Sequence, residues 1–447
     1  MNSGDGDGWF FFGKKPSNEV FDMTDEDIEY LIRFAGEEDR WSQGVREQVK
    51  YRDKHPQNPL LDMVGIFNVG GTIMPYPFGK VLTIDSRRHL FRGEISQFSE
   101  SLPSLNRAIR VRNLDEKEAE LYRAVANMRI WQFADFIQRF DIVRYWEYNL
   151  GVDVNYKALA QHYGFQTSLL DFTNDFRVAL FMATCVYDWD TDSYRPLRQE
   201  DIDRAANKTG NPAYGMIFHS PDWALDYNNG EQALRIGMRL MKDEKRNHPY
   251  PVDSPELDGA VFQIGCQPFF RCKEQSGYVM PVRTDSPLQD NLYLEKMRFK
   301  QSVELSERVY EMMDGGRKVF PEEGISEAMP TIRQIQNSHI FSKDDLECAY
   351  EIDEADKNLF PTIDSLHEAL QNFTIDGEKI IIQDDHVSYP LPRPTRRRIN
   401  KKYNKTDINK YIGGMMHATS EDWRRLRNNG TIVSGNSHNS HSNKNKK

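Results

Sequence analysis

The 447 residues predict two or three domains, or one elaborated domain, at roughly 150 residues per domain. Apolar residues make up 38% and charged residues 28% of the chain, which excludes the disordered and collagen-like classes of protein. The net charge of −10 divides into +11 on residues 391–447 and −21 on residues 1–390. An acidic body of this kind is not typical of a nucleic-acid-coating protein, whereas the basic tail could contact an anion.

The chain shows no sign of a membrane segment or a secretory leader. No apolar run approaches the roughly 20 residues that span a bilayer. The start, Met1–Asp7, is acidic and glycine-rich, unlike a signal peptide. The cysteines form no CxxC pair, which argues against a disulfide framework. We therefore expect a cytoplasmic protein without a membrane partner.

The first third of the chain predicts a leader, a helix and two short strands. Thr24 and Asp27 match a capping box, and the apolar residues after them repeat at helical spacing. Residues 51–60 are polar and predict a linker. Glycine turns flank apolar runs at 65–72 and 80–84, which predict strands.

The middle of the chain alternates helical and extended patterns. Residues 115–148 have the clearest helical period and predict two helices with a bend. Residues 155–163 predict a short helix that Asn155 caps and Gly164 ends. The next predicted elements are a strand at 167–173 and a helix from 174 or 175 to 187, strands at 215–219, 259–265 and 277–282, and helices at 302–313, 344–350 and 363–370.

This order lacks regular strand–helix alternation and predicts an α+β fold, with a mixed small sheet flanked by helices. An N-terminal helical segment precedes it and a disordered basic C-terminal tail follows it, where prolines oppose regular structure. The predicted division is a leader and helix at 1–60, a main domain at 64–350 with core motifs at 81–320 and insertions at 188–212 and 221–258, a C-terminal segment at 351–390, and a basic low-complexity tail at 391–447.

Three segments carry residues that suggest a binding site. In Phe91-Arg92-Gly93-Glu94, an arginine follows a strand-like run and can direct its guanidinium into a cleft, since Gly93 would let a ligand approach the backbone. The alternative is a turn whose arginine pairs with one of the many acidic residues.

The second segment runs from Ala158 to Thr173. His162 ends a predicted helix, where a protonated imidazole is favoured. A period of two places Thr167, Asp171 and Thr173 on one face of the following strand, which suggests a polar site. Alternatively, Asp171 caps the next helix and the threonines are surface residues.

The third segment, Arg271 to Val279, combines a carboxylate (Glu274), a carboxamide (Gln275), a thiol and a glycine in a polar loop that enters a strand. The alternative is a solvated turn.

In order and spacing, these segments resemble the FRG domain, a family named for its Phe-Arg-Gly motif. The resemblance rests on three groups of residues: Phe91-Arg92-Gly93 with Leu102-Pro103-Ser104-Leu105-Asn106-Arg107 just downstream; Ala160-Gln161-His162-Tyr163-Gly164 leading to Thr167, Leu169-Leu170-Asp171, Thr173 and the Ala179-Leu180-Phe181 helix; and Arg271 with Gln275 and Gly277. It covers roughly residues 81–320. Phe172, Tyr163 and Asn174 depart from the residues usual in the family.

The order of polar residues is also similar to that of ADP-ribosyltransferases, in which an arginine on an early strand, a Ser/Thr-bearing strand and a late acidic or amide residue form the site. By this analogy the fold would be ADP-ribosyltransferase-like and the ligand NAD. The predicted catalytic residues are Arg92, Thr167, Asp171, Glu274 and Gln275; the predicted ligand-binding residues are Phe91, Gly93, Glu94, His162, Tyr163, Thr173 and Arg271. No metal is expected, because the histidines and cysteines lack metal-ligand spacing.

Three functions remain open at this point. The first is an NAD-dependent ADP-ribosyltransferase or NAD hydrolase that acts as a toxin or defence effector, for example against phage. The second is a non-catalytic FRG module that binds a nucleotide-like molecule or a protein partner. In the third, the basic tail binds nucleic acid through its phosphates.

Overall fold

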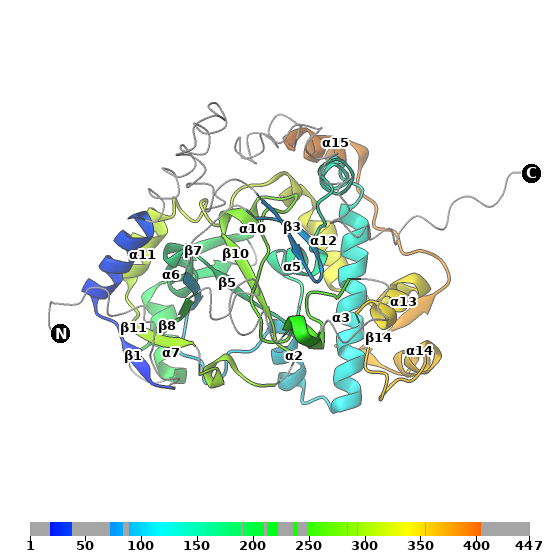
Figure 1. Cartoon of the computed structure of the whole chain (residues 1–447), viewed down its shortest axis with the longest axis horizontal. Helices are drawn as coiled ribbons and strands as arrows, with labels where there is room; N and C mark the ends of the chain where they lie inside the picture. Colours follow the sequence, from blue (N-terminus) through cyan, green and yellow to red (C-terminus); the bar gives the residue numbers. More distant parts are fainter. Residues whose placement is uncertain are drawn as a thin grey trace, which may run out of the picture.

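The computed structural model describes residues 18–37, 72–83, 89–188, 191–209, 212–221, 236–239, 249–283, 285–292, 294–353 and 355–403. Over these residues the α+β prediction is confirmed: a mixed seven-stranded sheet is accompanied by helices and two-stranded ribbons (Figure 1). The predicted linker at 51–60 and nearly all of the predicted strand at 65–72 lie outside the described residues.

The central sheet is antiparallel except at one edge, where β1 runs parallel to β11. Its strands follow the order β1 (Val20–Asp22), β11 (Glu295–Lys300), β8 (Tyr214–Pro221), β4 (His89–Glu94), β5 (Leu169–Thr173), β10 (Gly277–Pro281) and β9 (Phe262–Gln263). Because side chains alternate along a strand, the neighbours Leu90 and Phe91 of β4 pack in different apolar clusters. The sheet is therefore covered on both faces.

One face of the sheet packs against three helices: a helix over residues 25–37, α6 (Phe176–Thr184) and α11 (Val303–Met312). The predicted capping box of the first helix is confirmed. The backbone N–H of Thr24 donates to Oδ2 of Asp27 at 2.8 Å, and that of Asp27 donates to Oγ1 of Thr24 at 3.2 Å. The helix and β1 thus attach the predicted leader region to the central sheet.

The predicted bend in the long helical region is confirmed. α3 (Glu116–Ile137) is followed by a break and then by α4 (Asp141–Arg144) and a π-helix (Tyr145–Leu150). As Figure 1 shows, α3 stands beside α13 (Lys343–Glu351) and α14 (Ile363–Gln371). Its other half contacts α5 (Tyr156–His162) and α12 (Met329–Gln336). This helix joins the C-terminal region to the part that carries the sheet.

The basic stretch after residue 390 is partly helical, contrary to the expectation that its prolines prevent regular structure. α15 spans Arg393–Lys402, with Pro394 in its first turn, where its missing N–H is tolerated. Ile399 is completely buried and Tyr403, just after the helix, is 3% exposed. Residues 404–447 lie outside the described residues.

The predicted helix at 174–187 is shorter than expected. α6 ends at Thr184, and Cys185–Asp188 forms β6, which pairs with β7 (Ser193–Pro196). The predicted insertion at 188–212 therefore contains β7 and also α7 (Gln199–Thr209). The remaining elements are β2 (Thr72–Tyr76), β3 (Gly79–Thr83), η4 (Pro255–Leu257), α10 (Arg271–Glu274), η5 (Leu288–Asp290), α2 (Ser104–Arg112), η6 (Gly324–Ala328), β12 (Ile340–Ser342), β13 (Thr374–Ile375), β14 (Glu378–Lys379) and β15 (Ile381–Gln383).

Among the described helices, none combines the length and the apolar character needed to cross a bilayer. The four cysteines, all in the described part of the chain, are unpaired.

Candidate functional site

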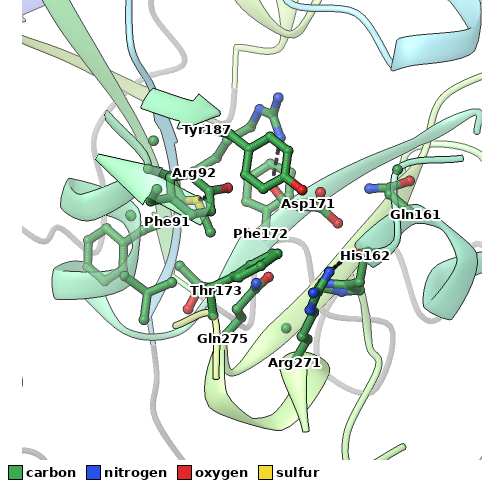
Figure 2. Close-up of a pocket in the computed structure, with 18 of the residues that line it drawn as sticks. Phe91, Arg92, Gln161, His162, Asp171, Phe172, Thr173, Tyr187, Arg271 and Gln275 are labelled. Atoms are coloured by element: carbon green, nitrogen blue, oxygen red, sulfur yellow. Dashed lines mark hydrogen bonds between the residues drawn. The ribbon is translucent and has the colours of Figure 1, made fainter. Parts of the chain in front are cut away.

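A pocket of about 410 Å³, called the central pocket below, opens where β4 and β5 meet. Its walls also include the end of α5, α6, the β6–β7 ribbon and the turn around α10 (Figure 2). Nine of the predicted site residues line it: Phe91, Arg92, Gly93, His162, Tyr163, Asp171, Thr173, Arg271 and Gln275. The other three, Glu94, Thr167 and Glu274, are not among its lining residues. Residues far apart in the sequence thus share one cavity.

Arg92 bridges the two strands at the edge of the pocket. β4 and β5 pair only through Phe91 and Thr173, so the ladder stops one residue before Arg92. Beyond this point the Arg92 side chain connects the two strands, because its Nη1 donates to the Asp171 carbonyl on β5 at 2.9 Å. Its Nε donates to Oε1 of Glu94 at 2.9 Å. Glu94 in turn accepts from the Ser101 hydroxyl at 2.5 Å. Glu94 therefore positions the guanidinium and does not itself line the cavity.

The packing of a helix requires a glycine at position 93, a reason that the sequence did not indicate. A Cβ atom at this position would lie 1.8 Å from the carbonyl oxygen of Ala179 on α6. Such a contact is far inside van der Waals distance, so only glycine allows α6 to lie this close to β4. The motif glycine thereby brings Ala179 and Met182 of α6 to the pocket wall.

The polar face predicted for the 167–173 strand is only partly present. β5 begins at Leu169, so Asp171 and Thr173 share the pocket face, but Thr167 precedes the strand. Thr167 is 1% exposed; its hydroxyl donates to Gln161 and accepts from the backbone N–H of Leu169. It shapes the turn before the strand and is not a pocket residue. Oδ1 of Asp171, in contrast, is buried and has no hydrogen-bond partner among the described residues.

His162 lies at the end of α5, where burial opposes the protonated imidazole that the helix position favours. Burial lowers the pKa of His162, with the charge of Arg271 acting in the same direction and that of Asp171 opposing both. Nε2 of His162 is buried, and no described residue hydrogen-bonds to it. Desolvation in the pocket wall therefore outweighs the favourable helix C-terminus.

Arg271 is a buried cation held between two aromatic rings. Its guanidinium carbon lies 3.6 Å from the ring centre of Phe320 and 4.6 Å from that of Tyr163. Nη1 donates to the His162 carbonyl at 3.1 Å, and Nε lies 3.5 Å from Oε1 of the buried Glu323. The Tyr163 hydroxyl also donates to Glu323, at 3.0 Å. The charge of Arg271 is thus already compensated by protein groups.

The two late candidates point in different directions. α10 makes the segment helical and not an extended loop, and Gln275 follows as its C-cap. Nε2 of Gln275 donates to the Val319 carbonyl at 3.1 Å, and Gln275 lines the pocket. The Glu274 side chain is 38% exposed and pairs with Lys273 at 3.6 Å. Glu274 is therefore excluded from the central pocket, and Asp171 is the acidic residue that lines it in the described structure.

Several lining residues were not predicted from the sequence, among them Arg107, Gln161, Tyr187, Tyr194 and Phe320. Arg107 lies on α2, and its guanidinium makes no ion pair or hydrogen bond to a described residue. Burial of its guanidinium and the nearby charge of Arg92 both lower the pKa of Arg107. A second arginine fifteen positions after Arg92 was the available signal. Both tyrosines come from the β6–β7 ribbon: Tyr187 was expected to end the preceding helix, and Tyr194 lies within the segment predicted as an insertion.

The comparison with known families identifies this region. Residues 87–191 match the family model of the FRG domain. The chain carries an FRG domain. The match contains Arg92, His162, Asp171 and Thr173, whereas Arg271 and Gln275 lie beyond it, so the resemblance expected over residues 81–320 is shown for its first part. No curated protein and no solved structure matches the chain.

The chemistry that the FRG domain pocket offers is ionic and aromatic. The described residues contain no cluster of three or more histidines, cysteines or acidic side chains that could hold a metal ion. The pocket combines two arginines, Arg92 and Arg107, the Asp171 carboxylate with one buried oxygen, and tyrosine and phenylalanine rings.

Proposed function

We propose that the central pocket of the FRG domain binds an ADP-ribose-bearing nucleotide, NAD in the first place, and cleaves its bond between nicotinamide and ribose. The observation that carries the proposal is the position of Asp171 in this pocket. It lies on β5, which Arg92 connects to β4, and one of its carboxylate oxygens lacks a hydrogen-bond partner among the described residues.

The two arginines suit the diphosphate. Arg92 is fixed by Glu94 and the Asp171 carbonyl through Nε and Nη1, which leaves Nη2 without a described partner. The Arg107 guanidinium makes no hydrogen bond or ion pair to a described residue. Two guanidinium groups close enough to influence each other gain from an anion that bridges them, and their planar forks match phosphate oxygens.

The rings suit the planar bases. Tyr187, Tyr194 and Phe320 form a cluster, with ring centres of neighbouring pairs 5.2–5.6 Å apart, and all three line the pocket. Stacking on such rings holds any flat heterocycle without reading its edge. Gln161, Thr173 and Gln275 would then supply hydrogen bonds to the ribose and amide groups.

Asp171 would carry the chemistry. Breaking the nicotinamide–ribose bond builds positive charge on the ribose, and a fixed negative charge at that place is the largest kind of catalytic contribution. Asp171 can fill this role because Glu274 faces solvent and Gln275 is neutral. An ADP-ribosyltransferase would pass the ribose to an acceptor and a hydrolase to water, and either activity would allow a toxin or defence role.

Ligand binding can be tested by thermal unfolding with NAD and ADP-ribose. At 100 times the dissociation constant, a ligand should add about 2.7 kcal/mol to the free energy of unfolding. Arg92→Ala should remove the shift, and Arg144→Ala, which alters an arginine away from the pocket, should keep it. No shift in the wild type would contradict the proposal.

Turnover is tested separately by release of nicotinamide. Asp171→Asn should lower the release rate by about 10²–10³-fold, as for loss of a charge-stabilising group, while the thermal shift remains. Glu274→Gln should retain the wild-type rate. If the wild type binds NAD but releases no nicotinamide, the domain is a non-catalytic binding module.

A further inference from the structure

A second cavity, of about 340 Å³, lies next to the loop between α5 and β5. Residues of α3, of this loop, of the turn after α12 and of the β13–β14 hairpin line it. Gly164 lines both cavities, but the other lining residues differ. Its volume is within the range of small-molecule sites.

The deeper side of the second cavity is rich in hydrogen-bond donors. Nε of Arg129 donates to the Ser338 carbonyl at 2.9 Å, whereas its Nη1 and Nη2 make no hydrogen bond to the described residues. Oε1 of Gln166 accepts from the Tyr122 hydroxyl at 2.9 Å, which leaves the Gln166 amide N–H groups without a described partner. The His339 imidazole, which also lines the cavity, has no such partner either.

The acidic residues of the cavity lie at its rim. Asp376, in the turn of the hairpin, accepts from Nη2 of Arg112 at 2.8 Å through Oδ1 and at 3.0 Å through Oδ2. Its charge is therefore already matched. Glu378 is exposed on the same hairpin. Arg129 is half-buried and is the lining arginine that lacks a carboxylate partner among the described residues.

We propose that the second cavity binds a small molecule bearing a phosphate or carboxylate group, which Arg129 holds with its free guanidinium edge while Gln166 and His339 donate further hydrogen bonds. An unsatisfied guanidinium edge in a half-buried position gains a bidentate pair from an oxyanion. A site of this kind is separate from the central pocket and does not depend on the function proposed there.

The test must keep the two cavities apart, because the arginines of the central pocket would also attract anions. Titration calorimetry at constant ionic strength is therefore done on the full chain with Arg92→Ala as the reference protein. Ribose 5-phosphate and citrate are the probes, one for each source of the oxyanion. We expect saturable binding of at least one probe to this reference.

Adding Arg129→Gln to the reference should weaken binding about tenfold or more, in line with the loss of charge-assisted hydrogen bonds. Adding Arg144→Gln, an exposed arginine of α4 outside both cavities, should leave the affinity unchanged. If Arg129→Gln does not fold, as judged by circular dichroism, Gln166→Leu takes its place with the same expected direction. Absence of saturable binding, or equal affinity in the Arg129 or Gln166 variant and the reference, overturns the proposal.

Discussion

Two buried histidines illustrate how single residues respond to their surroundings. His162 lies in the wall of the central pocket, and His219 lies in the sheet next to Glu295, with Nδ1 and Oε2 2.7 Å apart. In both, burial lowers the pKa although a nearby carboxylate acts in the opposite direction. Desolvation therefore outweighs the ionic attraction, and both side chains are neutral near neutral pH.

This neutrality predicts a loss of stability in acid. Because the folded pKa values lie below the unfolded value of about 6.5, the unfolded chain takes up protons first as the pH falls below that value. The free energy of unfolding should fall by at most about 1.4 kcal/mol per pH unit for each histidine, over the window between the unfolded and folded pKa values. Urea melts over a pH series should show a smaller slope for His219→Gln, with the exposed His386→Gln as the control; an unchanged slope would contradict a buried neutral His219.

At the scale of the elements, the contact of β4 with α6 determines the shape of the central pocket. Because Gly93 has no side chain, the backbone of α6 packs directly against the backbone of β4. In this position α6 contributes Ala179 and Met182 to the pocket wall. The motif Phe-Arg-Gly thus combines a core residue, a pocket arginine and a packing glycine in consecutive positions.

We expect Gly93→Ala to destabilise the protein by about 1–3 kcal/mol or more, because the added methyl group overlaps the Ala179 carbonyl. Gly36→Ala is the matched control, since nothing lies within 4 Å of a Cβ in that helix, and it should change stability by about 1 kcal/mol or less. Chemical denaturation measures both. Wild-type stability of Gly93→Ala would mean that β4 and α6 are further apart.

The basic helix α15 is an element of the folded body as well as a carrier of charge. Ile399 packs in the cluster that contains α5 and α12, and the Tyr403 hydroxyl donates to Oε2 of Glu323 at 3.1 Å. Glu323 also lies beside Arg271, so α15 supports the back of the central pocket.

Replacing Ile399 by alanine should therefore cost about 2–5 kcal/mol, as for other fully buried isoleucines. Ile381, which is 45% exposed, provides the same substitution at a surface position, with an expected cost within about 0.5 kcal/mol. Thermal and chemical unfolding distinguish the two cases. Equal effects of both substitutions would show that α15 does not pack as described.

At the scale of the whole molecule, a buried ionic network joins three distant parts of the chain. Nζ of Lys157 on α5 donates to Oδ1 of Asp253 at 2.8 Å and to Oδ1 of Asp353 at 2.7 Å. The Ser168 hydroxyl donates to Oδ2 of Asp253 at 2.5 Å, and Nε1 of Trp131 donates to Oδ2 of Asp353 at 2.7 Å. The network connects α5, the segment before η4 and the turn after α13, so the C-terminal region is held to the FRG domain by charge as well as by α3.

Lys157→Met should destabilise the whole fold by about 3–5 kcal/mol, because it leaves two buried carboxylates without their cation. Lys343→Met, which removes the exposed partner of Asp384, should have no resolvable effect. Adding Asp353→Asn to Lys157→Met should recover part of the loss, since one unpaired charge is then removed. If Lys157→Met unfolds like the wild type, the network does not contribute to stability.

The sequence alone determined the elements whose signals are local: the capped helix near Thr24, the bend after α3, the cap at Asn155 and the α+β class. Helical periodicity and capping residues are patterns within a few neighbouring positions, so they can be read without knowledge of tertiary contacts. The motif order also indicated the FRG domain. The assignment of Arg92, Asp171 and Gln275 to one cavity required a strand pairing across the sheet, which no local pattern contains.

Only the tertiary structure decided which polar residues face the pocket. Thr167 carries suitable chemistry but is buried outside the pocket, and the Glu274 side chain is partly exposed to solvent. Tyr194, in contrast, comes from a segment without a site signal and lines the pocket. The same holds for the pairing of β1 with β11 and for the burial of Ile399 on α15, which depend on contacts with segments far away in the sequence. Burial and strand register are set by contacts between distant segments, so the direction and charge of a side chain are known only once those segments meet.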